Sequence, residues 1–172
     1  MPIYALGDLV PRIDPSAFVH PDAVIIGDVT IGPESSIWPT AVLRGDQAPI
    51  VIGAQTSIQD GTVIHVSRAV PTNVGNRCVV GHNAHLEGCS ILDYCLIGSG
   101  SVVLHHVVVG PHSLVGAGAM VPNNKVIPPH ARALGVPVTI VQDVIGSQDF
   151  ESAVDGYIEN VHRYAAELRR LD

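Results

Sequence analysis

Aliphatic residues recur at every sixth position through much of this chain. The spacing runs from Ile13 to Leu43 and again from Ile97 to Ile127. In the middle of the chain it relates Ile52, Ile58 and Ile64, and then Val74, Val80 and Leu86. A period of six is neither helical nor a simple strand alternation. It predicts a short strand, a corner and another short strand.

Three such strands close a triangular coil of about 18 residues, and successive coils stack at the strand spacing of about 4.8 Å. The repeated aliphatic side chains then point into a prism. The composition agrees, because 47% of the residues are hydrophobic but only 4% are aromatic, which suits a narrow interior. Glycine often follows the aliphatic residue, as at Gly53, Gly75 and Gly81. We expect these glycines to supply corner backbone that β-branched residues adopt at a cost.

Two segments interrupt the repeat, and both are expected to be ordinary loops. They are residues 44–49 and residues 67–73. After Ile127 the repeat ends, and from about Ser147 to Leu171 apolar residues fall at helical spacing instead. The sequence therefore predicts an all-β parallel β-helix over residues 1–140. Residues 141–172 are predicted to hold a C-terminal helix that packs alongside the same domain.

Charge and composition exclude several partners. The formal net charge is −7, and no Lys/Arg cluster precedes the last helix, so nucleic acid and anionic membranes are poor partners. No apolar run approaches the roughly 20 residues that span a bilayer. The N-terminus lacks the pattern of a secretory signal. The odd number of cysteines, Cys78, Cys89 and Cys95, predicts buried thiols in a reducing cytoplasm.

Histidines beside the aliphatic ladder predict a metal site. The step from Ile64 to Leu86 is 22 residues, which is one coil plus the four extra residues of the second loop. His65 and Glu87, each one residue later, should point outward from one face about 4.8 Å apart. His85 points outward from the same face. His82 lies near another corner, so it would reach an ion held by a neighbour in a three-fold trimer.

Two sequence blocks carry a family resemblance. WPTAVLRGD at residues 38–46 and IQDGTVIH at residues 58–65, followed by VGH at residues 80–82, resemble the γ-class carbonic anhydrases and their relatives. The resemblance covers nearly the whole chain. It implies a left-handed β-helix, a homotrimer and three metal sites between subunits. Each site would take two histidines from one chain and one from the next.

The resemblance assigns most ligands but leaves the third open. His65 matches the first ligand, and His82 matches the ligand lent across the interface. The family usually has histidine where this chain has Glu87. Position favours Glu87 and ligand chemistry favours His85, because zinc catalytic sites commonly use imidazole nitrogen. A metal-free site is a third possibility.

Other residues match the family's site in the same way. Arg44 and Asp46 resemble a pair that forms an inter-subunit salt bridge. Gln59 resembles the residue that positions the metal-bound hydroxide, Asp60 its hydrogen-bonded neighbour, and Tyr157 a polar group near substrate. The family's acidic proton-shuttle loop is missing, since residues 67–73 contain no carboxylate. Proton export would then need His85, Glu87 or buffer. The pair at residues 105 and 106, both histidine, is expected to be structural.

The resemblance implies zinc-hydroxide attack on carbon dioxide to give bicarbonate, with Zn²⁺, or else Fe²⁺ or another divalent metal, as cofactor. Two other functions compete with this lyase. One is a catalytically inactive trimeric scaffold or assembly protein of the same family, which the change at Glu87 favours. The other is a hexapeptide acyltransferase that uses acetyl-CoA, although the two blocks are not typical of those enzymes.

Overall fold

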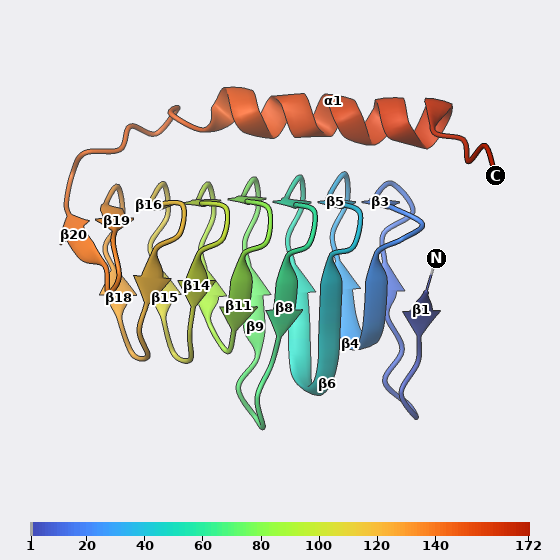
Figure 1. The fold of residues 1–172 in the computed structure, drawn as a ribbon, viewed down its shortest axis with the longest axis horizontal. Coiled ribbons are helices and arrows are strands. Elements are labelled where there is room, and N and C mark those ends of the chain that lie inside the picture. Colours follow the sequence, from blue (N-terminus) through green and yellow to red (C-terminus); the bar gives the residue numbers. More distant parts are fainter. Residues whose placement is uncertain (1) are drawn as a thin grey trace.

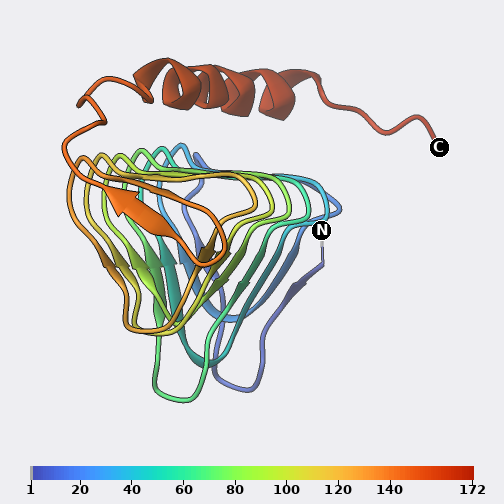
Figure 2. The same ribbon diagram turned by 60° about the vertical axis from the view of Figure 1, so that its left-hand side comes forward.

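The computed structural model describes residues 2–172, and they form a three-sided prism of stacked β coils with one helix alongside (Figures 1 and 2). The repeat predicted this fold, and the prediction is confirmed. The helix α1 spans Glu151–Glu167, a narrower range than the apolar spacing suggested. Arg169 and Arg170 lie beyond its end. The division at residue 140 into two parts of one domain stays a prediction.

Two faces of the prism belong to one sheet, because the long strands β4 and β6 turn a corner and pair with strands on both sides. Its strands are β1 (Ile3–Tyr4), β2 (Arg12–Ile13), β4 (Val24–Ile31), β6 (Val42–Ile52), β8 (Val63–His65), β9 (Thr72–Val74), β11 (His85–Glu87), β12 (Ser90–Ile91), β14 (Val102–Val103), β15 (Val108–Val109), β17 (Met120–Val121) and β18 (Val126–Ile127).

The third face is a separate sheet, parallel except for its last strand, which pairs antiparallel. Its strands are β3 (Phe18–Val19), β5 (Ser36–Ile37), β7 (Ser57–Ile58), β10 (Val79–Val80), β13 (Leu96–Ile97), β16 (Leu114–Val115), β19 (Arg132–Leu134) and β20 (Thr139–Val141).

The aliphatic ladder fills the prism as the period predicts. Ile64 pairs with Leu86, Ile58 with Val80 and Ile52 with Val74 in neighbouring coils. The exposed fraction of each of these side chains is at most 2%. Each of these side chains packs between the equivalent side chains of the coils above and below, which exclude it from water. Burial of apolar surface is the main favourable contribution to the free energy of folding. The three cysteines are buried and unpaired, as expected.

Two expectations about the backbone were wrong. Residues 44–49 are not a loop but part of the continuous strand β6, which pairs with β4 across a register shift between Gly27 and Val29. The glycines after the aliphatic residues are needed for space and not for a left-handed backbone. A Cβ on Gly53, for example, would lie 2.6 Å from the backbone of Gly75 in the next coil. The second interruption is a real loop, since β8 ends at His65 and β9 begins at Thr72.

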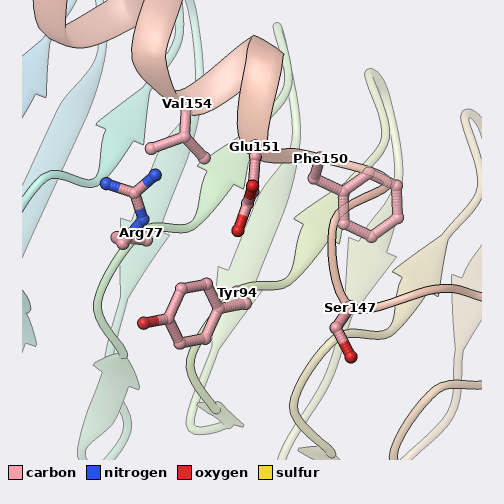
Figure 3. A pocket seen from close by; sticks show the side chains of 6 residues that line it. All are labelled: Arg77, Tyr94, Ser147, Phe150, Glu151 and Val154. Carbon is pink, nitrogen blue, oxygen red and sulfur yellow. The ribbon is translucent and has the colours of Figure 1, made fainter.

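The helix lies over the third face of the prism, where it packs against β3 and β5 (Figures 1 and 2). Trp38 and Phe18 pack against Tyr164, with ring centroids 4.9 Å and 5.8 Å apart. Arg77, at a corner, pairs with Asp155 of α1 at 2.8 Å. Further along, Tyr94 lines a small pocket together with Phe150 and Glu151 at the start of the helix (Figure 3). Aromatic packing and corner side chains therefore fix the helix to the coils.

Candidate functional site

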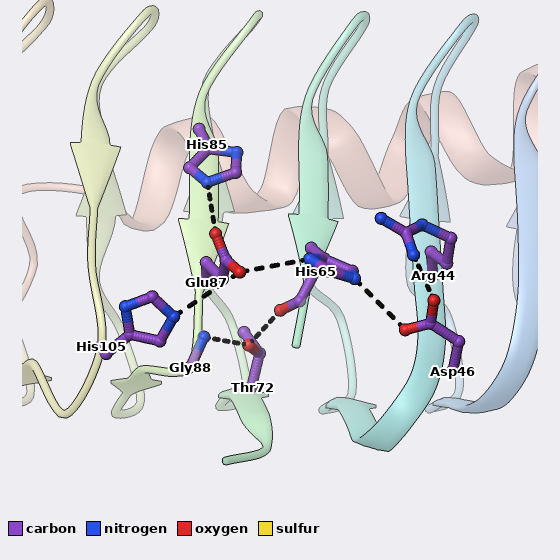
Figure 4. Close-up of polar contacts among 8 residues, drawn as sticks. All are labelled: Arg44, Asp46, His65, Thr72, His85, Glu87, Gly88 and His105. Atoms are coloured by element: carbon purple, nitrogen blue, oxygen red, sulfur yellow. Dashed lines mark hydrogen bonds and ion pairs between the residues drawn. The ribbon is translucent and has the colours of Figure 1, made fainter. Parts of the chain in front are cut away.

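The stacking of coils brings His65 and Glu87 together as predicted. Arg44, His65 and Glu87 are register partners on β6, β8 and β11. The Nδ1 atom of His65 lies 3.2 Å from Oε1 of Glu87 (Figure 4). Thr72 donates a hydrogen bond to the carbonyl of His65 at 2.6 Å and accepts one from Gly88 N–H at 2.8 Å, which ties the two coils together beside the pair.

Asp46 holds the other side of the His65 ring. Its Oδ1 atom lies 3.2 Å from Nε2 of His65, and its Oδ2 atom forms a close ion pair with Arg44. A neutral imidazole has one N–H, so it can donate to only one of its two carboxylate neighbours. If a metal were held between His65 and Glu87, the proton would sit on Nε2 facing Asp46 and the Nδ1 lone pair would be free for the ion. A carboxylate that fixes the tautomer in this way is typical of metal-binding histidines.

Glu87 is the centre of this group. Its Oε2 atom lies 3.2 Å from Nε2 of His85, and its Oε1 atom lies 3.5 Å from Nε2 of His105 in the next coil. We call Asp46, His65, His85, Glu87 and His105 the Glu87 cluster. Its side chains are 17–35% exposed, so the cluster opens onto the surface of one face.

The carboxylates of the cluster ionise readily. Burial raises the pKa of Glu87, but the hydrogen bonds with His85 and His65 outweigh burial and hold it below its usual value. Burial also raises the pKa of Asp46, and the hydrogen bond and positive charge of Arg44 again shift it below its usual value. Both groups are therefore anionic near neutral pH, which suits the binding of a cation.

The remaining predicted residues lie elsewhere in the chain. His82 Nδ1 pairs with Asp60 Oδ2 at 2.9 Å, and both side chains are about half exposed, at 49% and 47%. Gln59, next to Asp60, is buried. Burial raises the pKa of Tyr157 on α1, and the charge of Asp60 raises it further against a hydrogen bond with Gln59. Within one chain, the predicted site residues therefore form two separate groups. One is the Glu87 cluster, and the other, which we call the second group, consists of Gln59, Asp60, His82 and Tyr157.

The donor atoms of the cluster are of the types that bind a divalent metal, but they are not arranged around one point where an ion could lie. Among residues 2–172, no three or more His, Cys, Asp or Glu side chains are arranged to hold an ion. The Glu87 cluster nevertheless offers three imidazoles around one carboxylate, a donor set that zinc accepts. A site built from it needs side-chain adjustment or a donor from another chain. The contact of His105 with Glu87 was not expected from the sequence, although its position one coil beyond Glu87 was a usable signal.

Comparison with known proteins agrees with the repeat. The family described as bacterial transferase hexapeptide (six repeats) matches residues 71–105 and 88–123. A solved structure from Bacillus cereus, provisionally named an acetyltransferase, superposes with a TM-score of 0.92 at 35% identity, covering 94% of this chain and 95% of that one. These findings define the class as left-handed parallel β-helices built from hexapeptide repeats.

Two relatives indicate a narrower family within this class of fold. Carnitine operon protein CaiE of Escherichia coli K12 is 38% identical over 144 residues, which cover 84% of this chain and 74% of that protein. Mitochondrial gamma carbonic anhydrase 2 of Arabidopsis thaliana is 43% identical over 112 residues, 62% of this chain. The match spans only 40% of the plant protein's length. The chain belongs to the γ-carbonic anhydrase-like family of hexapeptide-repeat proteins.

Within residues 2–172, no helix has the length and apolarity that crossing a membrane requires.

Proposed function

We propose that this protein is a metal-dependent hydratase of carbon dioxide that acts as a homotrimer, with Zn²⁺, Fe²⁺ or another divalent metal between subunits. The observation that carries the proposal is the contact of His65 with Glu87, at the positions where the family places two ligands of one ion. The 43% identity to a plant gamma carbonic anhydrase supports the same reaction class.

His65 and Glu87 would hold the metal from one chain, and His82 of the partner subunit would complete the set. The 2.9 Å contact between His82 Nδ1 and Asp60 supports this role, because it leaves Nε2 of His82 free to bind an ion. His85 contacts Glu87 and has no recorded contact with His65, so the geometry favours Glu87 as the third ligand and His85 as its hydrogen-bonded neighbour. When bound, a divalent metal lowers the pKa of water toward neutrality.

The chain's own residues would orient the reactants and carry the proton away. Asp46, held by Arg44, fixes the His65 ring. Gln59, Asp60 and Tyr157 of the partner subunit would approach carbon dioxide together with its His82, since all four lie in the second group. His85 is 35% exposed and hydrogen-bonded to Glu87, so it can pass the proton released by hydration to solvent buffer.

The test is stopped-flow hydration of carbon dioxide by protein purified without oxygen and loaded with metal. We expect activity above buffer, one metal per chain, and loss of both in His65→Ala. Metal-loaded protein with no activity above buffer would contradict the hydratase.

A second candidate is a non-catalytic trimeric assembly protein of the same family. The carboxylate at Glu87, and the open arrangement of the donors in residues 2–172, favour it. A trimer that binds no metal would select this function. Binding of acetyl-CoA would instead select the acyltransferase, the class after which the Bacillus cereus protein is named.

A further inference from the structure

His105 lies against the candidate metal site from the coil beyond it. It follows β14, the strand that pairs with β11, while His65 ends β8 on the other side of β11. The two rings therefore approach Glu87 from opposite coils (Figure 4). Both contact the same oxygen, Oε1 of Glu87, at 3.2 Å from His65 and 3.5 Å from His105.

Gly88 provides the space that the His105 ring occupies. A Cβ at residue 88 would lie 2.8 Å from Cδ2 of His105, closer than real side chains approach. The backbone is fixed at the same point, because His106 N–H donates to the Gly88 carbonyl at 2.7 Å. A side chain at residue 88 would therefore require the His105 ring or its neighbour Val70 to move. The position of His105 is therefore built into the corner.

The spacing of the donors fits a metal better than a direct ion pair. Hydrogen bonds in which the acceptor carboxylate is ionised are usually about 2.7–2.9 Å long. The contact of His82 with Asp60, at 2.9 Å, is of this kind. The contacts of Glu87 with His65 and His105 are longer, at 3.2 Å and 3.5 Å. Tetrahedral ligands about 2.0–2.1 Å from zinc stand roughly 3.3 Å apart, close to the distances of Glu87 Oε1 from His65 and from His105.

We propose that His105 is a ligand of the same metal, and that it supplies the imidazole which this chain lacks at residue 87. The inference rests on the proposed function, because it concerns the metal of that site. His65 Nδ1, Glu87 Oε1 and His105 Nε2 are then the donors of one chain. Small side-chain rotations would be needed to bring them around one ion, which would also have to take His82 of the partner subunit and water, as a five-coordinate zinc can.

The experiment compares cobalt binding by metal-free full-length protein, wild type and variants. His105→Phe keeps the ring volume without a ligating nitrogen, and His105→Ala removes the ring. His106→Asn is the matched control, since His106 is exposed, adjacent and in a left-handed conformation that asparagine tolerates. Isothermal titration gives the Kd, and the visible absorption of bound Co²⁺ reports the number and kind of its ligands.

We expect both His105 variants to bind Co²⁺ at least about tenfold more weakly, since even the loss of an outer-shell partner costs 10–100-fold. Their cobalt spectrum should change, while His106→Asn stays like wild type. A shift of the His105 ring-nitrogen resonance when wild type takes up Zn²⁺ tests the same contact without any variant.

His105 variants with wild-type affinity and spectrum, or an unmoved His105 resonance, would overturn the role of His105 and leave metal-dependent hydration standing. Cobalt binding that depends on His105 without hydration activity would support His105 and contradict the hydratase. A wild-type protein that binds no divalent metal would overturn both.

Discussion

Two columns of side chains run along the outside of the prism, and both contain histidines from successive coils. The Glu87 cluster lies on one face. The second column, which we call the Tyr94 stack, lies at a corner and consists of Tyr94, His112 and His130. Their rings are parallel within 6°, with centroids 4.7 Å and 5.0 Å apart. The backbone repeat sets the spacing in both columns.

The neighbours of the histidines differ between the columns. In the Glu87 cluster each imidazole meets a carboxylate. In the Tyr94 stack the rings meet one another, and Nδ1 of His112 is buried with no hydrogen-bond partner among the described residues. His130 Nδ1 donates to the carbonyl of Ile145 at 3.0 Å, which secures the segment leading to α1. Coil stacking therefore gives proximity, and the side chains alongside decide between a polar site and a structural stack.

The largest effect on stability is expected at Gly88, which admits the ring of His105 to the cluster. Gly88 and Gly100 have similar left-handed backbones, with φ of +62° and +66°, but a Cβ meets other atoms only at Gly88. Gly100→Ala should cost about 1 kcal/mol through its backbone alone. Gly88→Ala should cost about 1–3 kcal/mol more, because it overpacks the corner. Urea unfolding measures both, and equal losses would mean that the close contact is unimportant.

Metal binding should stabilise the protein through the cluster and not through the stack. Zn²⁺ at 100 times its Kd should raise the free energy of unfolding by about 2.7 kcal/mol, because it binds the folded state. Glu87→Ala should abolish this gain, and His112→Phe should keep it. Thermal unfolding with and without Zn²⁺ makes the measurement. If Zn²⁺ still stabilises Glu87→Ala but no longer stabilises His112→Phe, the metal binds at the Tyr94 stack and not at the Glu87 cluster.

Replacing histidine by phenylalanine should raise stability in the Tyr94 stack but weaken metal binding in the Glu87 cluster. At residue 112 it removes a buried, unpartnered nitrogen and keeps the stacked ring, so we expect stability to rise by about 1 kcal/mol. At residue 105 the same change should weaken metal binding. Chemical denaturation of His112→Phe decides the first part, and a clear loss of stability would show that the Nδ1 atom has a partner such as water.

The smallest effect is expected from acid, through the Asp46 carboxylate of the cluster. The pKa of Asp46 is lower in the folded protein than its usual value, so its contribution to stability is present above that value and is lost as the pH falls through the folded pKa. Stability should therefore decline below about pH 4, and Asp46→Asn should reduce this decline. The difference should stay under about 1 kcal/mol, because Arg44 is 43% exposed and solvent screens the pair. If the stability of Asp46→Asn falls with decreasing pH as steeply as that of the wild type, the predicted contribution of Asp46 is wrong.

The repeat made much of the cluster predictable. Once the period was six and the second loop was counted, His65 and Glu87 had to be neighbours, and they are. The contact of His105 with Glu87 was not predicted, because it depends on the turn of one corner and on the space left by Gly88. The continuity of β6 through residues 44–49 was also missed, since a strand with a register shift has no simple period.

The amino-acid sequence alone determined the prism, its coil length, its aliphatic interior and the helix that follows, because these depend on a local repeat that each coil copies from the last. The three-dimensional structure decided which side chains meet across coils: Asp46 with His65, His105 with Glu87, and the Tyr94 stack. The reason is physical, since such contacts depend on side-chain rotamers and corner conformations, which no residue spacing specifies.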